Sequence, residues 1–313
     1  MPAETMQMEP PNLTPHPAAD PVRSHTLTPM AWHAQLQLDY TQTGADAASS
    51  DPLRTVARHT HTGPLRILQS LYPEGDAVCH NVLVHPPGGL VGGDVLELDV
   101  QASGQAHGLL TTPGASRFYR SAGELALQDT RIRLNDAARL EWLPAEAIYY
   151  DACQAENRLR IELAPDASLM GWDVAALGLP HAGLPFANGT LLQHIEIPGL
   201  WLERGRIAAA DTRLLHSPLG LAGHNCIATL FFCSGSPLGR ARQNAALDAA
   251  RACIDSHPLA ASAGATGPNP QVVVVRALAP QVEAAMELLR AIRVAWRAEL
   301  WQLGAGVPRI WAM

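Results

Sequence analysis

The 313-residue chain contains no lysine, and all 22 of its basic side chains are arginine. A Walker-type phosphate loop needs a lysine to hold the β- and γ-phosphates, and a Schiff-base enzyme needs a reactive amine. Both classes of protein are therefore excluded. The chain also lacks the HExxH, GxSxG and GxGxxG motifs, which lowers the expectation of an enzyme. We interpret Glu141, Glu146 and Asp151, the carboxylates of "LEWLPAEAIYYDAC", as structural surface groups.

Positive charge is not concentrated in any segment, and the formal net charge is -7. Because nucleic acids and anionic membrane surfaces attract clustered basic residues, we expect neither as a partner. No apolar run is long enough for a transmembrane helix, and the N-terminus lacks the apolar core of a signal peptide. The five cysteines are an odd number without a CxxC pair, which favours a reducing compartment and hence the cytoplasm.

The remaining sequence divides into an arm and one domain. Residues 1–29 are rich in proline and carry few side chains that a core could bury, so we expect a disordered arm. Residues 30–313 are predicted to form a single domain rich in β-structure. Apolar and polar residues alternate there in many short runs, such as the one with Leu96, Leu98 and Val100. Alternation of this kind indicates strands with one buried face.

The C-terminal third combines two buried strands with two predicted helices. The strand candidates are "IATLFFCS" and "VVVVRAL", because both are short and almost entirely apolar. The segment "LGRARQNAALDAARACIDS" has a helical composition, and apolar residues at helical spacing predict a second helix from Pro280 to about Leu303. The small residues of the intervening segment, about 257–271, predict a flexible loop.

Three tryptophans, Trp296, Trp301 and Trp311, lie near the C-terminus. A helix that packs on its own core would bury Trp296 together with Met286 and Leu289, which share its helical spacing. An exposed aromatic cluster would instead provide a surface for a partner protein. The sequence leaves both interpretations open, and the three tryptophans are candidate partner-binding residues.

The stretch "CHNVLVHPPGGLVGGDVLELDV", residues 79–100, offers several possible metal ligands. Cys79, His80, His85 and Asp94 carry donor groups that suit nickel, copper or zinc, but their spacing matches no closed metal site. Cys79 and His80 are neighbours in a strand and should point to opposite faces. A β-structured, metal-dependent hydrolase that uses His80, His85 and Asp94 is the alternative function that these residues suggest.

The prolines and glycines of this stretch have a structural explanation. Proline presets the backbone and glycine permits a left-handed conformation, so "PPGG" should reverse the chain between two strands. The second glycine pair indicates another special backbone position, next to Asp94, whose carboxylate could cap a turn or face a polar passage. The predicted turn residues are Pro86, Pro87, Gly88, Gly89, Gly92 and Gly93.

Four stretches together resemble the urease accessory protein family UreD, called UreH in some bacteria. They are "LYPEGDAVCHNVLVHPPGGLVGGDVLELDV", "LLTTPGASRFYRS", "LEWLPAEAIYY" and "PRIWAM". The similarity extends from about Thr62 to the C-terminus. It implies a mainly β fold, with many short strands stacked in a β-helical body and two helices in the C-terminal third.

The resemblance also implies a function without catalysis. A protein of this family is a urease maturation chaperone that docks on the urease apoprotein, recruits UreF and the GTPase UreG, and supports nickel delivery to the urease active site. No tightly bound cofactor is implied, with nickel at most a transient passenger through the protein interior.

Individual residues match the family motifs with one departure. The candidates for a transient nickel path are Asp94, from the family's GGD motif, with His80, His85 and Cys79. The polar end of the TTPGA motif matches Arg117, Tyr119 and Arg120. Where the family usually has an arginine and a glutamate, this chain has Leu179 and Leu184. If that glutamate passes nickel, this chain must use another group, such as His181, or transfer nickel less well.

Overall fold

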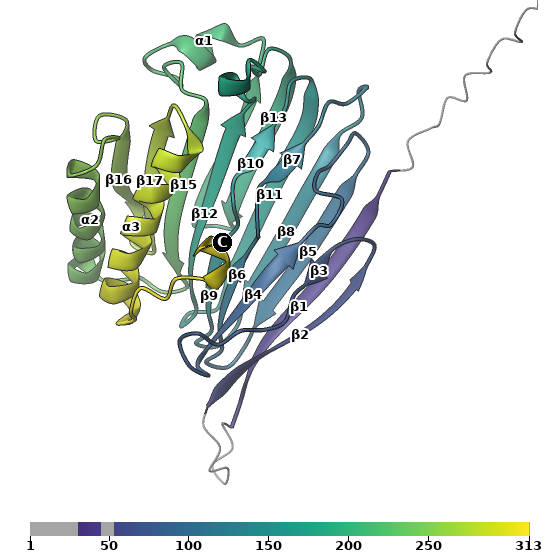
Figure 1. Cartoon of the computed structure of the whole chain (residues 1–313). Coiled ribbons are helices and arrows are strands. Elements are labelled where there is room, and N and C mark those ends of the chain that lie inside the picture. The colour runs from purple at the N-terminus through teal and green to yellow at the C-terminus, as the bar shows by residue number, and fades with distance from the viewer. Residues whose placement is uncertain (1–30, 45–52, 313) are drawn as a thin grey trace, which may run out of the picture. The chain divides into compact units, whose positions relative to one another are not determined.

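The computed structural model describes residues 31–44 and 53–312. In this part of the chain, two β-sheets face each other, and helices α2 (Arg240–Asp255) and α3 (Val282–Trp301) lie on the outer face of the larger sheet, towards one end of it (Figure 1). The arm predicted over residues 1–29 lies outside the described residues.

Each sheet is built from strands that are far apart in the sequence. In spatial order, the seven-stranded sheet contains β14 (Trp201–Ala208), β13 (Gly189–Ile197), β11 (Cys153–Leu163), β8 (Ala126–Leu134), β5 (Val95–Ala102), β1 (His33–Thr43) and β2 (Arg54–Thr62). The path of the ten-stranded sheet is β16 (Ala263–Asn269), β17 (Val272–Ala279), β15 (Cys226–Ser234), β12 (Ser168–Leu177), β9 (Arg139–Leu143), β6 (His107–Thr111), β4 (Val78–Val84) and β3 (Arg66–Ile67). Beside this path, β10 (Ala147–Tyr149) pairs with β12 and with β7 (Ser116–Phe118). The short helices are α1 (Thr212–His216), η1 (Pro180–Ala182) and η2 (Arg309–Ala312).

Between β4 and β13 the chain passes back and forth between the two sheets and winds a β-solenoid. Its coils are β4–β5, β6–β8, β9–β11 and β12–β13. Within each sheet, equivalent strands of neighbouring coils pair in parallel. The prediction of a mainly β fold with stacked short strands and two helices in the C-terminal third is therefore confirmed.

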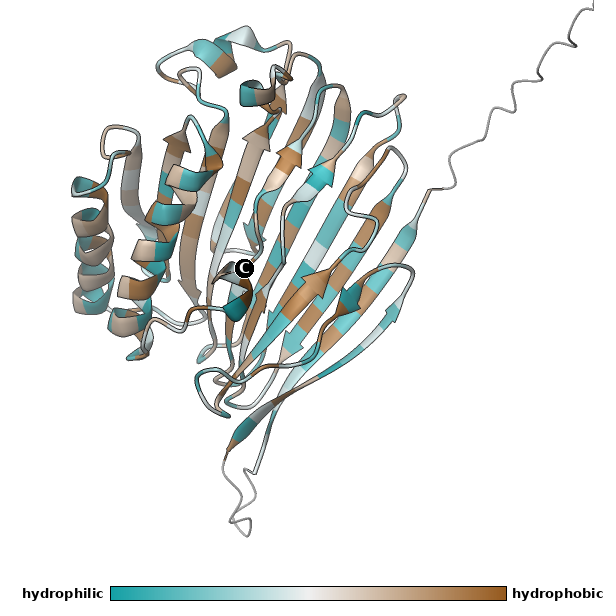
Figure 2. Cartoon of the chain, viewed as in Figure 1, coloured by the Kyte–Doolittle hydropathy of each residue, from teal (hydrophilic) through white to brown (hydrophobic). Residues whose placement is uncertain are grey.

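The two sheets differ in how they are buried, and their sequences differ accordingly. In the seven-stranded sheet only the inner face is covered, so strands such as β1 alternate strictly between buried and exposed residues. Figure 2 shows this alternation as brown and teal bands. The ten-stranded sheet packs against the other sheet on one face and against α2 and α3 on the other. This double burial explains the apolar runs of β15 and β17.

Tight turns close one end of the solenoid. Residues 103–106, 135–138 and 164–167 connect consecutive coils, and each turn ends in a fully buried alanine, namely Ala106, Ala138 or Ala167. Neighbouring turns are joined where the amide of Gly104 donates to Oδ2 of Asp136 at 2.9 Å. At the opposite end, longer loops lead from the ten-stranded sheet back to the seven-stranded one. These loops contain many of the residues of the stretches that resemble the UreD family.

Two local predictions need correction. The segment 257–271 is not one flexible loop, because Ala263–Asn269 forms β16 and pairs antiparallel with β17. Its small residues fit an edge strand, since most of them face solvent. Helix α3 begins at Val282 rather than Pro280, because Gln281 has an extended backbone at the helix start. None of the described helices has the length and apolar character of a membrane span.

Candidate functional site

The four proposed nickel-path residues of the stretch 79–100 do not meet at one point. Cys79 lies in the core between the sheets, and its thiol donates to Oδ1 of Asn81 at 3.4 Å. His80 points elsewhere, with Nε2 2.7 Å from Oε1 of Glu74. Among the described residues, no group of three or more histidine, cysteine, aspartate or glutamate side chains is placed to hold a metal ion. The structure thus does not assemble His80, His85 and Asp94 as the ligands of a hydrolase site.

Asp94 caps its own loop. Its Oδ2 accepts a hydrogen bond from the amide of Val91 at 2.9 Å, and its Oδ1 accepts one from the amide of Trp32 at 2.8 Å. The carboxylate is buried, and each of its two oxygens accepts a hydrogen bond from a backbone amide. This geometry favours the turn interpretation of Asp94 over a place on a metal path.

The surrounding prolines and glycines shape the same loop. The amide of Gly88 donates to the carbonyl of His85 at 2.8 Å and closes a turn around Pro86 and Pro87. Gly88 has φ +79° and Gly93 has φ +92°, the region in which glycine is favoured. A side chain at Gly89 would collide with Tyr119, and one at Gly92 would collide with Ser121.

His85 lies apart from these caps and faces a cavity. The cavity has a volume of about 260 Å³ and is also lined by residues 112–117 and Gln128. Burial lowers the pKa of His85, although the charge of Asp94 opposes the shift. Its Nε2 is buried and has no hydrogen-bond partner in the described chain. A neutral imidazole is therefore available at the cavity wall.

A row of polar side chains extends from this cavity between the two sheets. A second, smaller cavity shares Ser116 and Gln128 with the first and reaches Asp173. Nε2 of Gln128 donates to Oδ1 of Asn157 at 3.4 Å, and Nδ2 of Asn157 donates to Oδ2 of Asp173 at 2.8 Å. We call this row the polar tract, and its members are Gln128, Thr130, Tyr149, Asn157, Asp173, Gln193, Glu203 and Thr229.

Strand register explains how the polar tract is assembled. Asn157 on β11 pairs with Gln193 on β13, and Asp173 on β12 pairs with Thr229 on β15. Directly paired residues of neighbouring strands project to the same face. Here that face is the one between the sheets, so polar residues from both sheets meet in one layer of the core.

The polar tract is unusual because several of its buried oxygens are unpaired. The hydroxyl oxygens of Tyr149 and Thr130 and Oε1 of Gln193 have no hydrogen-bond partner among the described residues. Buried polar atoms are paired in most proteins, because an unpaired one costs about 1–3 kcal/mol. The polar tract therefore holds oxygen atoms that remain available to another group.

Asp173 is the acidic centre of the polar tract. Burial raises the pKa of Asp173 to about 6, and the nearby charge of Glu203 adds to the shift. Hydrogen bonds from Gln193 and Asn157 act in the opposite direction. None of these neighbours is positively charged, so the Asp173 carboxylate has no cationic partner within the group that determines its pKa.

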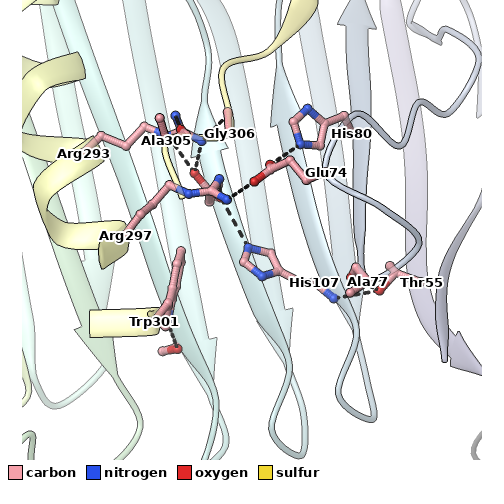
Figure 3. A network of polar contacts seen from close by, with 12 residues as sticks. Thr55, Glu74, Ala77, His80, His107, Arg293, Arg297, Trp301, Ala305 and Gly306 are labelled. Atoms are coloured by element: carbon pink, nitrogen blue, oxygen red, sulfur yellow. Dashed lines mark hydrogen bonds and ion pairs between the residues drawn. The ribbon is translucent and has the colours of Figure 1, made fainter. Parts of the chain in front are cut away.

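A second set of buried charges lies on the other face of the ten-stranded sheet (Figure 3). Oε2 of Glu141 accepts a hydrogen bond from Nε of Arg293 at 2.7 Å, and Oε1 accepts one from Nη1 of Arg297 at 2.6 Å. Arg297 also pairs with Glu74, and Nε2 of His107 lies 3.3 Å from Oε1 of Glu141. We call this group the arginine clamp.

The arginine clamp fastens the C-terminal part of the chain. Arg293 and Arg297 come from α3, whereas Glu141 comes from β9. Arg293 also donates to the carbonyls of Ala305 and Gly306, at 2.9 and 3.0 Å. Burial would raise the pKa of Glu141, but contact with His107 and the charges of Arg293 and Arg297 outweigh it and lower the pKa to about 2. The interpretation of Glu141 as a surface carboxylate is therefore wrong.

The predicted tryptophan surface is also wrong for two of its three residues. Trp296 and Trp301 are buried, and their indole N–H groups donate to the carbonyl of Ala246 and to Oγ of Ser168. Both therefore pack in the core, as the helix-packing interpretation expected for Trp296. Trp311 is half-buried and stacks on Trp172 with ring centroids 5.3 Å apart.

Leu179 and Leu184 close a short loop through two backbone hydrogen bonds. The amide of Leu179 donates to the carbonyl of Leu184 at 2.7 Å, and the reverse bond measures 3.1 Å. The side chain of Leu184 is exposed. Neither leucine lines the two cavities of the polar tract.

Comparison with known proteins decides the family. The sequence profile of the UreD urease accessory protein matches residues 33–312. The chain belongs to the UreD family. It is 67% identical over 283 residues to the urease accessory protein UreD of Variovorax paradoxus (strain S110), which covers 90% of this chain and 100% of that protein. It is 51% identical over 295 residues to the UreD of Methylibium petroleiphilum (strain ATCC BAA-1232 / LMG 22953 / PM1), with 90% and 99% covered.

Membership of the UreD family gives the general function. The chain is an accessory factor of urease maturation, not a catalyst, and it acts with the maturation machinery of this nickel enzyme. The prediction of a non-enzymatic urease maturation factor is confirmed.

Proposed function

We propose that this UreD-family chain docks on the urease apoprotein, recruits UreF and UreG, and passes nickel through its interior along the polar tract. Nickel is the cargo in this scheme, and no resident cofactor is involved. The observation that supports the proposal best is the combination of unpaired buried oxygens with an acid that lacks a cationic partner. The cytoplasm is the proposed location, in keeping with five free cysteines.

A nickel ion that crosses a protein needs nitrogen or oxygen donors to replace its hydration water, held weakly enough to let the ion leave. The polar tract offers such donors in sequence. His85 stands at the wall of the first cavity, and Asn157 and Asp173 follow in the second. Amide and hydroxyl oxygens alone bind nickel weakly, so Asp173 provides the charge that draws the ion inward.

The arginine clamp is unsuited to this task. Glu141 is already neutralised by Arg293 and Arg297, and these guanidinium groups would repel a divalent cation. Asp94 is unsuited as well, because both of its oxygens accept backbone hydrogen bonds. We therefore move the acidic station of the nickel path from Asp94 to Asp173.

Activation of co-expressed urease as a function of nickel concentration tests the proposal. Asp173→Asn keeps the shape of the side chain and removes its charge. We expect this variant to need about tenfold more nickel for half-maximal activation. One contact with a charged group contributes about enough binding free energy to give a factor of this size. Complex formation with the urease apoprotein should be unchanged.

Asp99→Asn is the matched control. Asp99 lies on the outer face of the seven-stranded sheet and pairs with Arg133 at 2.8 Å, so its loss should not change the nickel requirement. Equal nickel requirements for Asp173→Asn and the unmodified chain would refute passage along the polar tract.

A further inference from the structure

The polar tract reaches the protein surface at an ion pair between Glu203 and Arg276. Glu203 lies on β14, the edge strand of the seven-stranded sheet, and Arg276 lies on β17 of the ten-stranded sheet. Nε of Arg276 donates to Oε2 of Glu203 at 3.0 Å. The pair therefore joins the two sheets across the open side of the sandwich, beside β14.

Strand register connects this pair to Asp173. Asp173 pairs with Thr229, and Thr229 pairs with Arg276, so the three residues form one row across β12, β15 and β17. The hydroxyl of Thr229 donates to Oε1 of Glu203 at 3.2 Å. Glu203 is also close enough to Asp173 for its charge to act on that carboxyl. The row therefore continues from Asp173 to the surface pair.

The surface pair differs from the arginine clamp in exposure. The side chain of Arg276 is 50% exposed and that of Glu203 is 25% exposed, whereas Arg293 and Glu141 are sealed from solvent. A partly exposed ion pair is weak, and its arginine can be rehydrated when it leaves. Removal of Arg276 from Glu203 is thus far easier than opening of the clamp.

We propose that the Glu203–Arg276 pair is the gate at the lateral end of the polar tract, an inference that rests on the proposed nickel passage. A divalent metal cation that arrives from Asp173 takes the Glu203 carboxylate as a ligand in exchange for the Arg276 guanidinium. The exchange needs no oxidant and leaves every covalent bond intact. Arg276 turns into solvent while the metal occupies Glu203 and returns when the metal has left.

Two substitutions with opposite expected effects test the gate. Arg276→Gln frees the Glu203 carboxylate and should lower the nickel concentration for half-maximal urease activation by about fivefold, the scale of an exposed ion pair. Glu203→Gln removes the ligand and should raise that concentration by a similar factor. The double variant should behave like Glu203→Gln alone.

A readout that does not depend on urease activity accompanies this comparison. The chain is purified in complex with UreF and UreG, loaded with nickel chloride, desalted, and analysed for nickel by mass spectrometry. Arg276→Gln should retain more nickel than the unmodified complex, and Glu203→Gln should retain less. Arg160→Gln serves as the control, because Arg160 forms an exposed pair with Glu162, away from the polar tract.

A purely structural clasp predicts a different pattern. If the pair only holds the sheets together, both single variants will raise the nickel requirement and lower thermal stability alike, and the gate is refuted. Unchanged activation in both variants refutes it as well. If Asp173→Asn has no effect, the nickel passage itself fails. If Asp173→Asn impairs activation but Glu203→Gln does not, only the gate fails.

Discussion

Glu141 and Asp173 lie on neighbouring strands, β9 and β12, and face opposite sides of the same sheet. Glu141 meets two arginines and a histidine, and its pKa falls to about 2. Asp173 meets only neutral donors and another acid, and its pKa rises to about 6. Burial raises the pKa of both carboxyls, although Glu141 is fully buried and Asp173 only partly, so the opposite outcomes come from the partners.

This contrast separates two uses of a buried acid. A carboxylate that is buried together with guanidinium groups has its charge neutralised, and here it fastens α3 to the solenoid. A carboxylate left among neutral groups destabilises the folded chain and keeps its capacity to bind a cation. Proteins retain such uncompensated acids mainly where function requires them. The comparison therefore supports a structural role for the arginine clamp and agrees with the proposed nickel passage along the polar tract.

Glu141→Gln should produce the largest effect on stability. It leaves Arg293 and Arg297 buried without their shared carboxylate, and breaking a buried ion pair from one side costs about 3–5 kcal/mol. Chemical denaturation of the purified chain measures the change in the free energy of unfolding. A loss below about 1 kcal/mol, the value of a surface pair, would show that Glu141 does not hold the arginine clamp together and would contradict the contrast with Asp173.

Acid should weaken the arginine clamp in a defined range. The pKa of Glu141 is about 2 in the folded chain, below the ordinary value of 4.5, so the stabilisation is complete above pH 4.5 and is lost as the pH falls toward 2. The loss amounts to about 3 kcal/mol, at 1.36 kcal/mol per pKa unit. Denaturation curves recorded between pH 6 and pH 2 measure it, and the Glu141→Gln variant should lack this part of the pH dependence.

Asp173→Asn should have the opposite effect on stability and raise the free energy of unfolding. The folded pKa of Asp173 is about 6 against an ordinary value of 3.8, so ionisation destabilises the folded chain increasingly between these two values. We expect the asparagine variant to be more stable by about 3 kcal/mol at pH 8, at 1.36 kcal/mol per pKa unit, with most of this gain lost at pH 4. Unfolding free energies at pH 8 and pH 4 provide the measurement. A variant less stable than the parent at pH 8 would show that Asp173 is compensated after all.

Arg160→Gln should have the smallest effect. Arg160 and Glu162 are both 50% exposed on β11, and such pairs contribute at most about 1 kcal/mol. A change in the unfolding free energy within that limit would show that burial, not ion pairing as such, gives the arginine clamp its strength. A larger loss would require a different explanation for the clamp.

The fold was predictable from the sequence to a large extent, because a strand with one buried face alternates between apolar and polar residues. Alternation in Leu96, Leu98 and Val100 predicted a strand with one buried face, and the structure has β5 there. The coiling of the strands came only from the family resemblance. A sequence signal for it exists in the buried turn alanines Ala106, Ala138 and Ala167, but their unequal spacing hides the repeat.

Of the candidate site only His85 was predicted, because strand register assembles the polar tract from distant residues. Gln128, Asn157, Gln193 and Glu203 look like isolated polar residues in separate strands. A stronger signal was Asp173, which interrupts the apolar run of β12, a strand buried on both faces. The arginine clamp had a comparable signal, since Arg293 and Arg297 lie one helical turn apart among the apolar residues of α3.

Nickel transfer from an assembled complex tests the central claim most directly. The chain, with or without Asp173→Asn, is purified in complex with UreF, UreG and the urease apoprotein, and complexes of equal mass are selected. A limiting amount of nickel is added, and the nickel bound to urease is measured over time. The account predicts slower transfer for Asp173→Asn at unchanged complex mass. Equal transfer rates for the two complexes would contradict it.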